Sequence, residues 1–339
     1  MPIKGRDIIV VGTSAGGLEA LSELIAHLPP DLPASLFVVQ HMPPQHSGGV
    51  LVERLQEMQK FTCTLAKDGE RFVRGRIYIA PPDCHLLLKG RHLLVSKGAR
   101  ENRYRPAIDP LFRSAAIAHG PRVIGVILTG LLDDGTVGLM AIKRCGGLTM
   151  VQDPTEAAYP DMPQSALNNV DVDFCGPAAE IGRFLAIYTC KPRGPKRTVP
   201  QDIRTEAVIA ERVLSDVSQV ETLGTQVPYN CPNCGGVLWA IGHSRAQRYR
   251  CHTGHSYTAA ALMTSQSERI EETLWISLRM FEERKNLLNN TAQQERRPRM
   301  KRWYWKQAKE TNVHIERIRA MLQTSQSLQS GTGLHSKDK

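Results

Sequence analysis

The chain contains 339 residues, and at roughly 150 residues per domain this length predicts about two domains with enough chain to bury a core. Hydrophobic residues make up 41% and charged residues 22%, which excludes a disordered chain as the default, and the net charge of +10 points toward acidic partners without locating the charge. The apolar runs are far shorter than the roughly 20 residues of a membrane-spanning helix, so we expect a cytoplasmic protein.

Up to about Tyr188, β-branched apolar runs alternate with helical stretches, and this alternation predicts βαβ units and a mostly parallel sheet. The expected strands are Ile8–Val11, Ser35–Gln40, Arg76–Ala80, Val123–Leu128 and Leu148–Gln152. The expected helices are Gly17–His27, Gly48–Gln56, Pro110–His119 and Val137–Arg144. Such sheets carry their functional residues in the loops at the carboxyl ends of the strands.

The second half of the chain has a different organisation. Cys190–Pro200 breaks both periodicities and indicates a linker, and a short helix is expected around Glu206–Val217. A compact block with cysteine and histidine follows at Tyr229–Tyr257, then a long helix from about Thr258 to Asn290. A second helix is expected from about Trp303 to Leu322, after the helix-breaking Pro298.

These patterns divide the chain into five parts. They are an α/β domain (1–190), a linker (191–225), a small zinc-ribbon-like module (226–260), a helical region (261–324) and a disordered tail (325–339).

The first predicted strand runs directly into Gly12-Thr-Ser-Ala-Gly-Gly17 and then a helix. A serine between small residues at such a turn can expose its hydroxyl, and the helix start supplies N–H groups for an oxyanion. The alternative is a nucleotide-binding turn, although Ser14 replaces the middle glycine of that fingerprint. The turn alone favours neither the nucleophile nor the ligand-binding turn.

Two further strand ends carry groups that suit a serine nucleophile. His41 ends the second strand and is placed to take a proton from Ser14, with His46 as the less favoured candidate. Either Asp133 or Asp134, after the strand Val123–Leu128, could orient the histidine, or the pair could simply cap the next helix. Three such groups at one edge of a sheet are jointly unlikely to arise by chance.

Five motifs resemble the catalytic domain of the CheB family, the protein-glutamate methylesterases of bacterial chemotaxis. They are Gly12–Gly17, Gln40–Pro44, Ile79–Pro82 with His85, Asn102–Asp109 and Leu128–Gly135, in the order and spacing of the family over about residues 5–188. The resemblance implies a doubly wound parallel α/β domain. In it Ser14 is the nucleophile, His41 the general base and then acid, and Asp134, the aspartate before the glycine, the orienting carboxylate.

The resemblance also implies an acyl-transfer reaction that needs no catalytic cofactor. The substrate is a glutamyl methyl ester on a methyl-accepting receptor protein, and glutamine deamidation is a second activity of the family. Backbone N–H groups near Ala15 and Leu131 are then expected to bind the oxyanion, and Arg105 to contact the substrate. A methyltransferase or another signalling protein is a further candidate partner.

The chain departs from the family in two places. Where the family usually carries Ser-Thr-Gly-Gly and Thr-Gly-Met-Gly, this chain has Ser14-Ala-Gly-Gly17 and Thr129-Gly-Leu-Leu132. Family members typically begin with a receiver domain, whereas the first catalytic strand here begins near residue 7, so we expect a standalone form without phosphorylation in cis. The alternative function is a catalytically weakened scaffold or signalling protein. An unrelated α/β-hydrolase is disfavoured by the order of the three groups.

The block Tyr229–Tyr257 contains Cys231-x2-Cys234, Cys251 and His255, which have the ligand number and spacing of a structural Cys3His zinc site. His252 is the alternative fourth ligand, and His255 is favoured because it keeps a turn's length from Cys251. Free thiols and a redox pair are weaker interpretations. A similar block with a helical tail also occurs in standalone CheB-like proteins.

The basic stretch Arg296–Lys306 contains three aromatic residues. It could bind phosphate groups or an anionic membrane surface, but the favoured interpretation is a solvated helix start whose aromatics pack on the preceding helix. The helices could also contact a receptor bundle or a second copy of the chain. We do not expect nucleic acid to be a partner.

Overall fold

The structure is a computed structural model that describes residues 5–211, 222–242 and 247–331. The chain divides into two compact units, Met1–Leu262 and Met263–Lys339.

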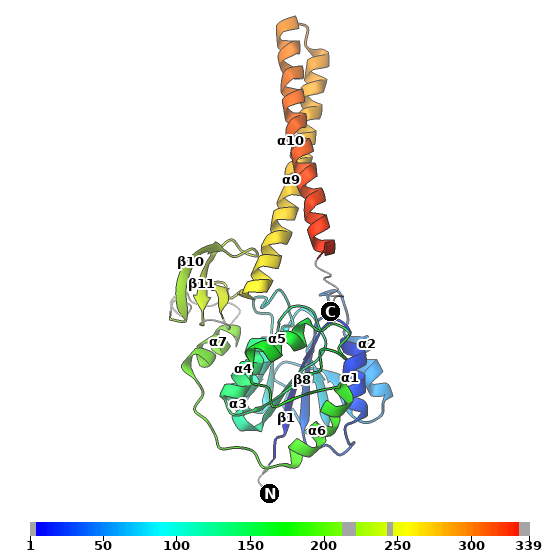
Figure 1. Ribbon diagram of the computed structural model, residues 1–339, viewed down its shortest axis with the longest axis vertical. Coiled ribbons are helices and arrows are strands. Elements are labelled where there is room, and N and C mark those ends of the chain that lie inside the picture. The colour runs from blue at the N-terminus through cyan, green and yellow to red at the C-terminus, as the bar shows by residue number, and fades with distance from the viewer. Residues whose placement is uncertain (1–4, 212–221, 243–246, 332–339) are drawn as a thin grey trace, which may run out of the picture. The chain divides into compact units, whose positions relative to one another are not determined.

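The first unit is built on a seven-stranded sheet in the order β3-β4-β2-β1-β7-β8-β9, in which all neighbouring strands are parallel (Figure 1). The strands are β1 (Ile8–Thr13), β2 (Ser35–Gln40), β3 (Thr62–Leu65), β4 (Arg76–Ile79), β7 (Val123–Ile127), β8 (Leu148–Gln152) and β9 (Phe174–Gly176). The strand order changes direction beside β1, as in doubly wound sheets. The predicted fold class, a doubly wound and mostly parallel α/β domain, is confirmed.

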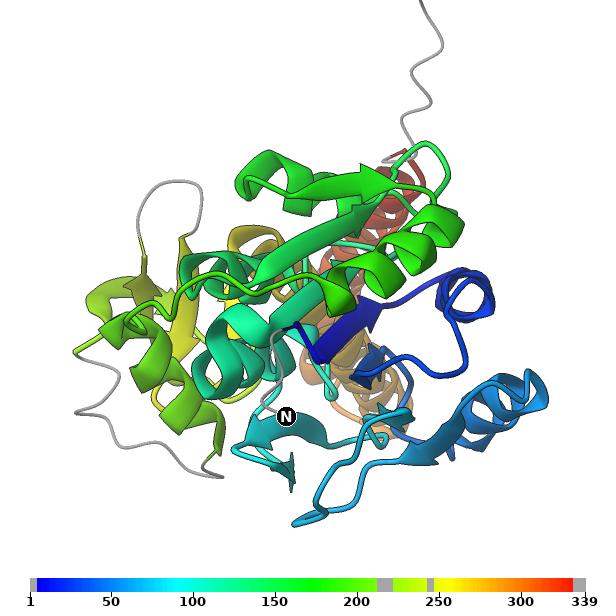
Figure 2. The same ribbon diagram turned by 90° about the horizontal axis from the view of Figure 1, so that it is seen from below.

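Helices cover both faces of this sheet, as the view in Figure 2 shows. The helices α1 (Gly17–Ala26), α2 (Gly49–Glu57) and α6 (Ala178–Cys190) pack on one face. The other face is covered by α3 (Ile108–His119), α4 (Thr136–Arg144) and α5 (Asp161–Asn169), and a short 3-10 turn at Gly120–Arg122 leads from α3 to β7.

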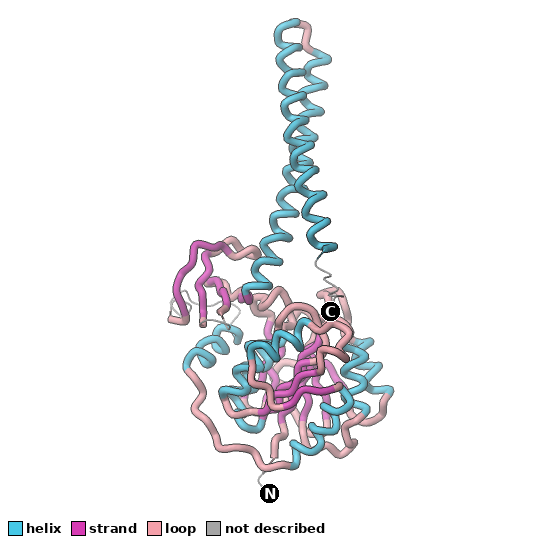
Figure 3. The backbone as a smooth tube through the Cα atoms, in the orientation of Figure 1, coloured by secondary structure: helices cyan, strands magenta, loops and turns pink. Residues whose placement is uncertain are grey.

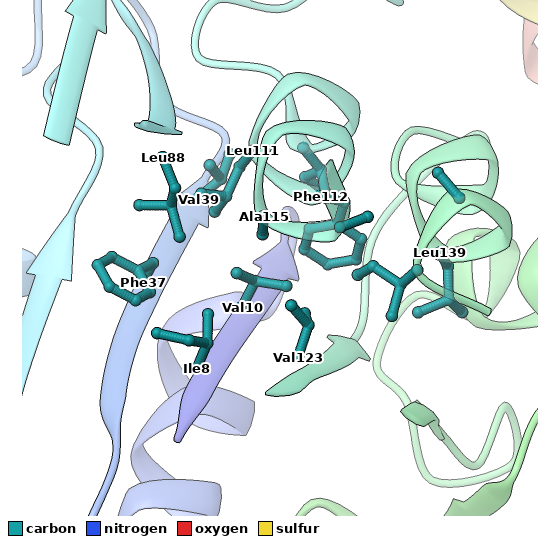
Figure 4. Close-up of a cluster of buried hydrophobic side chains, with 14 of the residues drawn as sticks. Ile8, Val10, Phe37, Val39, Leu88, Leu111, Phe112, Ala115, Val123 and Leu139 are labelled. Atoms are coloured by element: carbon teal, nitrogen blue, oxygen red, sulfur yellow. The ribbon is translucent and has the colours of Figure 1, made fainter. Parts of the chain in front are cut away.

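The core on the second face is made of branched and aromatic side chains. Figure 4 shows Phe112 of α3 and Leu139 of α4 together with Val10 of β1 and Val123 of β7 in one cluster, and all four side chains are fully buried. A central strand that is covered on both faces explains why β1 is apolar at nearly every position.

The expected strands and helices of this domain are present, with ends that differ by two residues or fewer. Four strands were not anticipated: β3, β9 and the antiparallel hairpin of β5 (His85–Lys89) and β6 (His92–Ser96). The strands β3 and β9 have four and three residues, which is too short for a period of two to stand out from the surrounding loops.

The helix α7 (Gln201–Glu211) lies inside the predicted linker and docks on the α/β domain. Ile203 joins the core cluster beside α3, and Glu206 is 1% exposed. The sequence predicted a short helix around Glu206–Val217, and its second half falls on residues 212–221, outside the described residues.

A small antiparallel sheet follows α7, in the order β10-β11-β12-β13. Its strands are β10 (Gly224–Asn230), β11 (Val237–Ile241), β12 (Arg248–Cys251) and β13 (Ser256–Thr258), drawn in magenta beside the larger sheet in Figure 3. We call residues 224–258 the Cys/His module. Its core is small, with Leu238, Tyr257, Ala261 and Leu262 packed around Cys231 and Cys251.

The second unit is a pair of long helices, α9 (Ala259–Gln294), which begins in the first unit, and α10 (Pro298–Gly331). Leu278, Ile315 and Leu322 are buried between them, and Arg319 pairs with Glu282. Pro298 was expected to lie outside a helix that begins near Trp303; instead it is the first residue of α10, where its missing N–H is not needed.

Two features of the second unit differ from the favoured interpretation of its sequence. Trp303 and Trp305 are 49% and 55% exposed, so these two aromatics of the basic stretch do not pack fully on the preceding helix. Helix α10 extends beyond Ser325 to Gly331, into the segment with a predicted disordered tail, and residues 332–339 lie outside the described residues.

Within the described part of the chain, no helix combines the length and the apolar character needed to cross a bilayer. The cytoplasmic location stays a prediction.

Candidate active site

Three adjacent strands of the large sheet end at the candidate site. Ser14 follows β1, His41 follows β2, and Asp134 lies between β7 and α4. Because β2, β1 and β7 are neighbours and parallel, their carboxyl ends meet at one edge. The topology therefore brings together three side chains that are far apart in the sequence.

The three side chains form a continuous hydrogen-bonded series. His41 Nδ1 lies 3.1 Å from Ser14 Oγ, and His41 Nε2 lies 2.8 Å from Asp134 Oδ2. In the chymotrypsin-type arrangement Nε2 faces the serine, so the imidazole here is turned the other way. A proton on Nε2 that is donated to Asp134 leaves Nδ1 free to accept the hydroxyl proton of Ser14.

The alternative residues named from the sequence lie elsewhere. Asp133 accepts a hydrogen bond from the Thr258 hydroxyl at 2.9 Å, whereas Asp134 faces the imidazole. His46 is exposed in the loop that follows His41.

The turn at Ser14 is held by its neighbours on both sides. The Ser14 N–H donates to Thr129 O at 3.0 Å, and the side-chain amide of Gln40 donates to Ser14 O at 2.6 Å. Gly16 has a left-handed φ of 71°, and a Cβ on Gly17 would lie 2.2 Å from Gln40 Oε1. Gly17 is therefore needed for the tight approach of this turn to β2, and Gly16 for its left-handed backbone.

The two backbone N–H groups expected to bind an oxyanion belong to Ala15, which follows Ser14, and to Leu131, which follows Gly130. Among the described residues, no hydrogen bond uses the N–H of Ala15 or of Leu131, whereas the neighbouring N–H groups of Ser14 and Gly130 donate to Thr129 O and Tyr159 O. Leu132, where the family usually carries glycine, has a φ of 63°, which is a strained conformation for a leucine.

The site opens into a cleft of about 470 Å³. Its lining includes Ser14, His41 and a basic group of side chains, Arg100, Arg103 and Arg105. Arg105 was expected to contact the substrate; it lines the cleft, but its guanidinium donates to Asp83 Oδ1 at 2.6 and 2.9 Å and to Gly98 O at 2.8 Å. These bonds fix Arg105 as part of the cleft wall.

Three residues of the fourth motif, to which the sequence assigned no role, belong to the site. Asn102 donates to Asp134 Oδ1 at 2.8 Å and to Asp109 Oδ2 at 2.9 Å, and the Tyr104 ring stacks on His41 with centroids 3.6 Å apart. Burial and the nearby charge of Asp134 raise the pKa of Asp109. The only sequence signal for these roles was the motif itself, since Asn102 and Tyr104 lie on an irregular loop and Asp109 lies in the first turn of α3.

A second constellation lies in the Cys/His module. The ligand atoms of Cys231, Cys234, Cys251 and His255 all lie within 4.8 Å of one another, and such a cluster could hold a metal ion. Cys234 Sγ is 3.7 Å from Cys251 Sγ, which is 3.5 Å from His255 Nδ1. Left-handed glycines after the cysteines, Gly235 and Gly254, donate back to Cys231 O and Cys251 O.

The fold and the geometry of the first site define a class of protein: an α/β domain with a hydroxyl, an imidazole and a carboxylate in series at one sheet edge, as in serine hydrolases. Residues 9–185 match the CheB methylesterase family, and the chain belongs to that family.

Similar proteins include protein-glutamate methylesterase/protein-glutamine glutaminase 3 of Burkholderia lata, 41% identical over 185 residues, and a protein-glutamate methylesterase/protein-glutamine glutaminase of Nitrosomonas europaea, 37% identical over 185 residues. Each alignment covers 53% of this chain, and it covers 50% and 51% of the two relatives. The chain thus spans about half the length of these relatives.

The crystal structure of the CheB methylesterase catalytic domain of Thermotoga maritima is also similar to this chain. Its sequence is 36% identical, the TM-score is 0.52, and the match covers 53% of this chain and 97% of that domain. Nearly the whole catalytic domain therefore has a counterpart here.

Proposed function

We propose that this protein is a protein-glutamate methylesterase that hydrolyses glutamyl methyl esters on methyl-accepting receptor proteins, and that it also deamidates glutamine side chains. The observation that carries the proposal is the series Ser14–His41–Asp134, with contacts of 3.1 and 2.8 Å, in a domain of the CheB methylesterase family. The arginines that line the cleft suit a receptor segment rich in acidic side chains.

The reaction begins when Ser14 Oγ attacks the γ-carbonyl carbon of the ester and His41 Nδ1 takes the hydroxyl proton. The carboxylate of Asp134 holds the imidazole and stabilises the imidazolium that forms. The N–H groups of Ala15 and Leu131 donate to the developing oxyanion. His41 then returns the proton to the leaving methoxide, and methanol departs from the acyl-enzyme.

Water completes the cycle. His41 takes a proton from the water as the water oxygen attacks the acyl carbon. His41 then returns this proton to Ser14 Oγ as the ester bond to Ser14 breaks, and the glutamate side chain is released and ionises to the carboxylate. With a glutamine substrate the same steps release ammonia in place of methanol. A catalytically weakened scaffold is not favoured, because the three side chains are within hydrogen-bonding reach of one another.

Methanol release from a methylated receptor fragment tests this proposal. Ser14→Ala is expected to abolish release while the thermal melting profile stays the same, because the substitution removes only the attacking oxygen. Ser267→Ala, at an exposed serine of α9, is the matched control and should keep full activity. Continued methanol release by Ser14→Ala would show that another group performs the reaction.

We further propose that Cys231, Cys234, Cys251 and His255 bind one structural Zn²⁺. Tetrahedral zinc with Zn–S bonds of about 2.3 Å and a Zn–N bond of about 2.0 Å separates two sulfurs by about 3.8 Å and a sulfur from a nitrogen by about 3.5 Å. The distances of 3.7 Å (Cys234–Cys251) and 3.5 Å (Cys251–His255) support this ion. Elemental analysis should find one zinc per chain, and the zinc should be lost in Cys234→Ser but kept in Cys190→Ser, at an exposed cysteine outside the cluster.

A further inference from the structure

The loop between β6 and α3, residues 100–105, touches two members of the catalytic series from behind. Asn102 donates to Asp134 Oδ1 at 2.8 Å, on the carboxylate whose other oxygen faces His41. Tyr104 stacks on the His41 imidazole with an angle of 12° between the ring planes. The position of this loop therefore affects both the orienting carboxylate and the general base of the proposed mechanism.

The backbone conformation of this loop depends on contacts with the groups around it. Asn102 and Arg103 are both left-handed, with φ values of 49° and 77°. Asparagine tolerates such a conformation, but for arginine it is costly and persists where the surroundings determine it. Asn102 is only 2% exposed, so the support comes from protein groups packed around it.

This support comes from strand β13 of the Cys/His module. The Asn102 N–H donates to Ser256 O at 2.7 Å, the Ser256 N–H donates to Arg100 O at 3.3 Å, and the Thr258 N–H donates to Asn102 Oδ1 at 3.2 Å. The Asn102 side chain thus accepts a hydrogen bond from the module with its oxygen and donates one to the catalytic carboxylate with its nitrogen.

A buried ion pair fixes the same loop to strand β12. Glu101 is 2% exposed and lies between two guanidiniums, at 2.6 Å from Arg113 of α3 and 3.0 Å from Arg250 of β12. Arg250 also donates to Gly254 O at 2.9 Å, in the turn between the candidate ligands Cys251 and His255. Both attachments of the loop lead directly to residues beside these ligands.

The Cys/His module has only a small hydrophobic core of its own. Small modules of this kind commonly gain much of their order from a bound metal, because so small a core offsets little of the conformational entropy lost on folding. His255 immediately precedes β13, so an ion bound to His255 limits the freedom of the strand that supports Asn102.

We propose that Asn102 is a positioning residue for ester hydrolysis and that the Cys/His module holds it in place. Metal bound in this module, by ligands remote from the substrate, is then required for full turnover. The inference rests on the proposed methylesterase activity. Asn102 touches Asp134 and not the substrate, and it acts by fixing the carboxylate that orients His41.

The first test removes the metal from the full chain with a chelator and a thiol reductant, and then adds Zn²⁺ alone. A fluorophosphonate probe reports the state of Ser14: the rate constant of labelling measures activation of the hydroxyl, and the final extent of labelling counts folded sites. We expect the rate constant to fall at least about tenfold in the depleted protein and to return with Zn²⁺. An unchanged rate constant in protein shown by elemental analysis to lack metal would overturn the inference.

The second test leaves the metal in place. Asn102→Gly removes the amide but keeps a residue that accepts a left-handed backbone, and Gln59→Gly is the matched control, since Gln59 is exposed and has a φ of 55°. We expect Asn102→Gly to lower kcat for methanol release at least about tenfold, with KM changed less than about threefold and zinc content unchanged. A kcat within about threefold of wild type would contradict the positioning role.

The two proposals fail in different ways. Metal-loaded wild-type protein that neither releases methanol nor reacts with the fluorophosphonate would refute the methylesterase activity, and the inference with it. If the wild-type protein is active, and neither metal removal nor Asn102→Gly changes the rate constant of labelling, the inference alone is refuted. A role of Asn102 in folding only would lower the extent of labelling and leave the rate constant unchanged.

Discussion

Gly130 lies directly behind Ser14 and offers a sharp test of the site geometry. The Gly130 N–H donates to Tyr159 O at 3.0 Å, and Gly130 O accepts from the Met162 N–H at 2.9 Å, so this backbone is held on both sides. A Cβ at position 130 would lie 2.7 Å from Ser14 Cβ and 2.2 Å from Met162 Sδ. Gly130→Ala therefore places an additional carbon against Ser14, the proposed nucleophile.

The size of the effect follows from these distances. Two carbons are in favourable contact at about 3.5 to 4.0 Å, so Ser14 and residue 130 must separate by roughly 0.8 Å or more. The buried Met162 side chain can rotate, but Ser14 is fixed by Thr129 O and Gln40. A displacement of about 1 Å in a catalytic group costs on the order of 100-fold in rate, and overpacking costs about 1–3 kcal/mol of stability.

The assay is kcat for methanol release, with thermal melting as the measure of folding. Gly194→Ala is the control, because no atom lies within 4 Å of a Cβ built at that exposed position. We expect Gly130→Ala to lose about 100-fold in kcat and Gly194→Ala to be unchanged. A folded Gly130→Ala protein with kcat within about threefold of wild type would refute the described packing behind Ser14.

Two further substitutions test the buried charges. Burial raises the pKa of Asp133 to about 6, above an unfolded value of about 3.9, so the free energy of unfolding falls as the pH rises through this range. Asp133→Asn lacks this titration. Between pH 4 and pH 7.5, its free energy of unfolding should therefore rise by roughly 2 kcal/mol relative to that of wild type, as measured by denaturation at the two pH values. A difference that stays constant between them would contradict the raised pKa of Asp133. Glu206 pairs with Arg248 and also lies 3.8 Å from Arg113 and from Arg250, so Glu206→Gln should cost about 3–5 kcal/mol. Glu57→Gln, in an exposed pair with Arg54, should cost less than about 1 kcal/mol, and equal losses would refute the difference in burial.

The parts of the fold that could be predicted from the sequence are those marked by a regular pattern of apolar residues. Buried parallel strands are continuous apolar runs, and Ser35–Gln40 and Leu148–Gln152 were predicted with the bounds that the structure has. The topology of such a sheet then places the strand ends beside one another, which is why Ser14 and His41 could be grouped with either Asp133 or Asp134 before any coordinates, and the family resemblance then selected Asp134.

The parts that could not be predicted depend on irregular backbone and on distant contacts. Asn102 acts from a left-handed loop that has no periodicity, and its partner Thr258 lies 156 residues away in the chain. Which imidazole nitrogen faces Asp134 depends on the direction of a single ring. The docking of α7 depends on Glu206, whose partners Arg113 and Arg248 belong to elements on either side of it in the sequence.

The buried charges also indicate why the Cys/His module docks in one position. Burial alone would raise the pKa of Glu101, but Arg113 and Arg250 outweigh it and hold that pKa far below its usual range, so the group stays ionised. Buried ion pairs add little net stability, because desolvation offsets their attraction. A shifted module, however, would separate Glu101 from Arg250 and Glu206 from Arg248, and breaking such a buried pair costs several kcal/mol. The network therefore selects one register of β13 against the loop, and that register is the one in which Asn102 reaches Asp134.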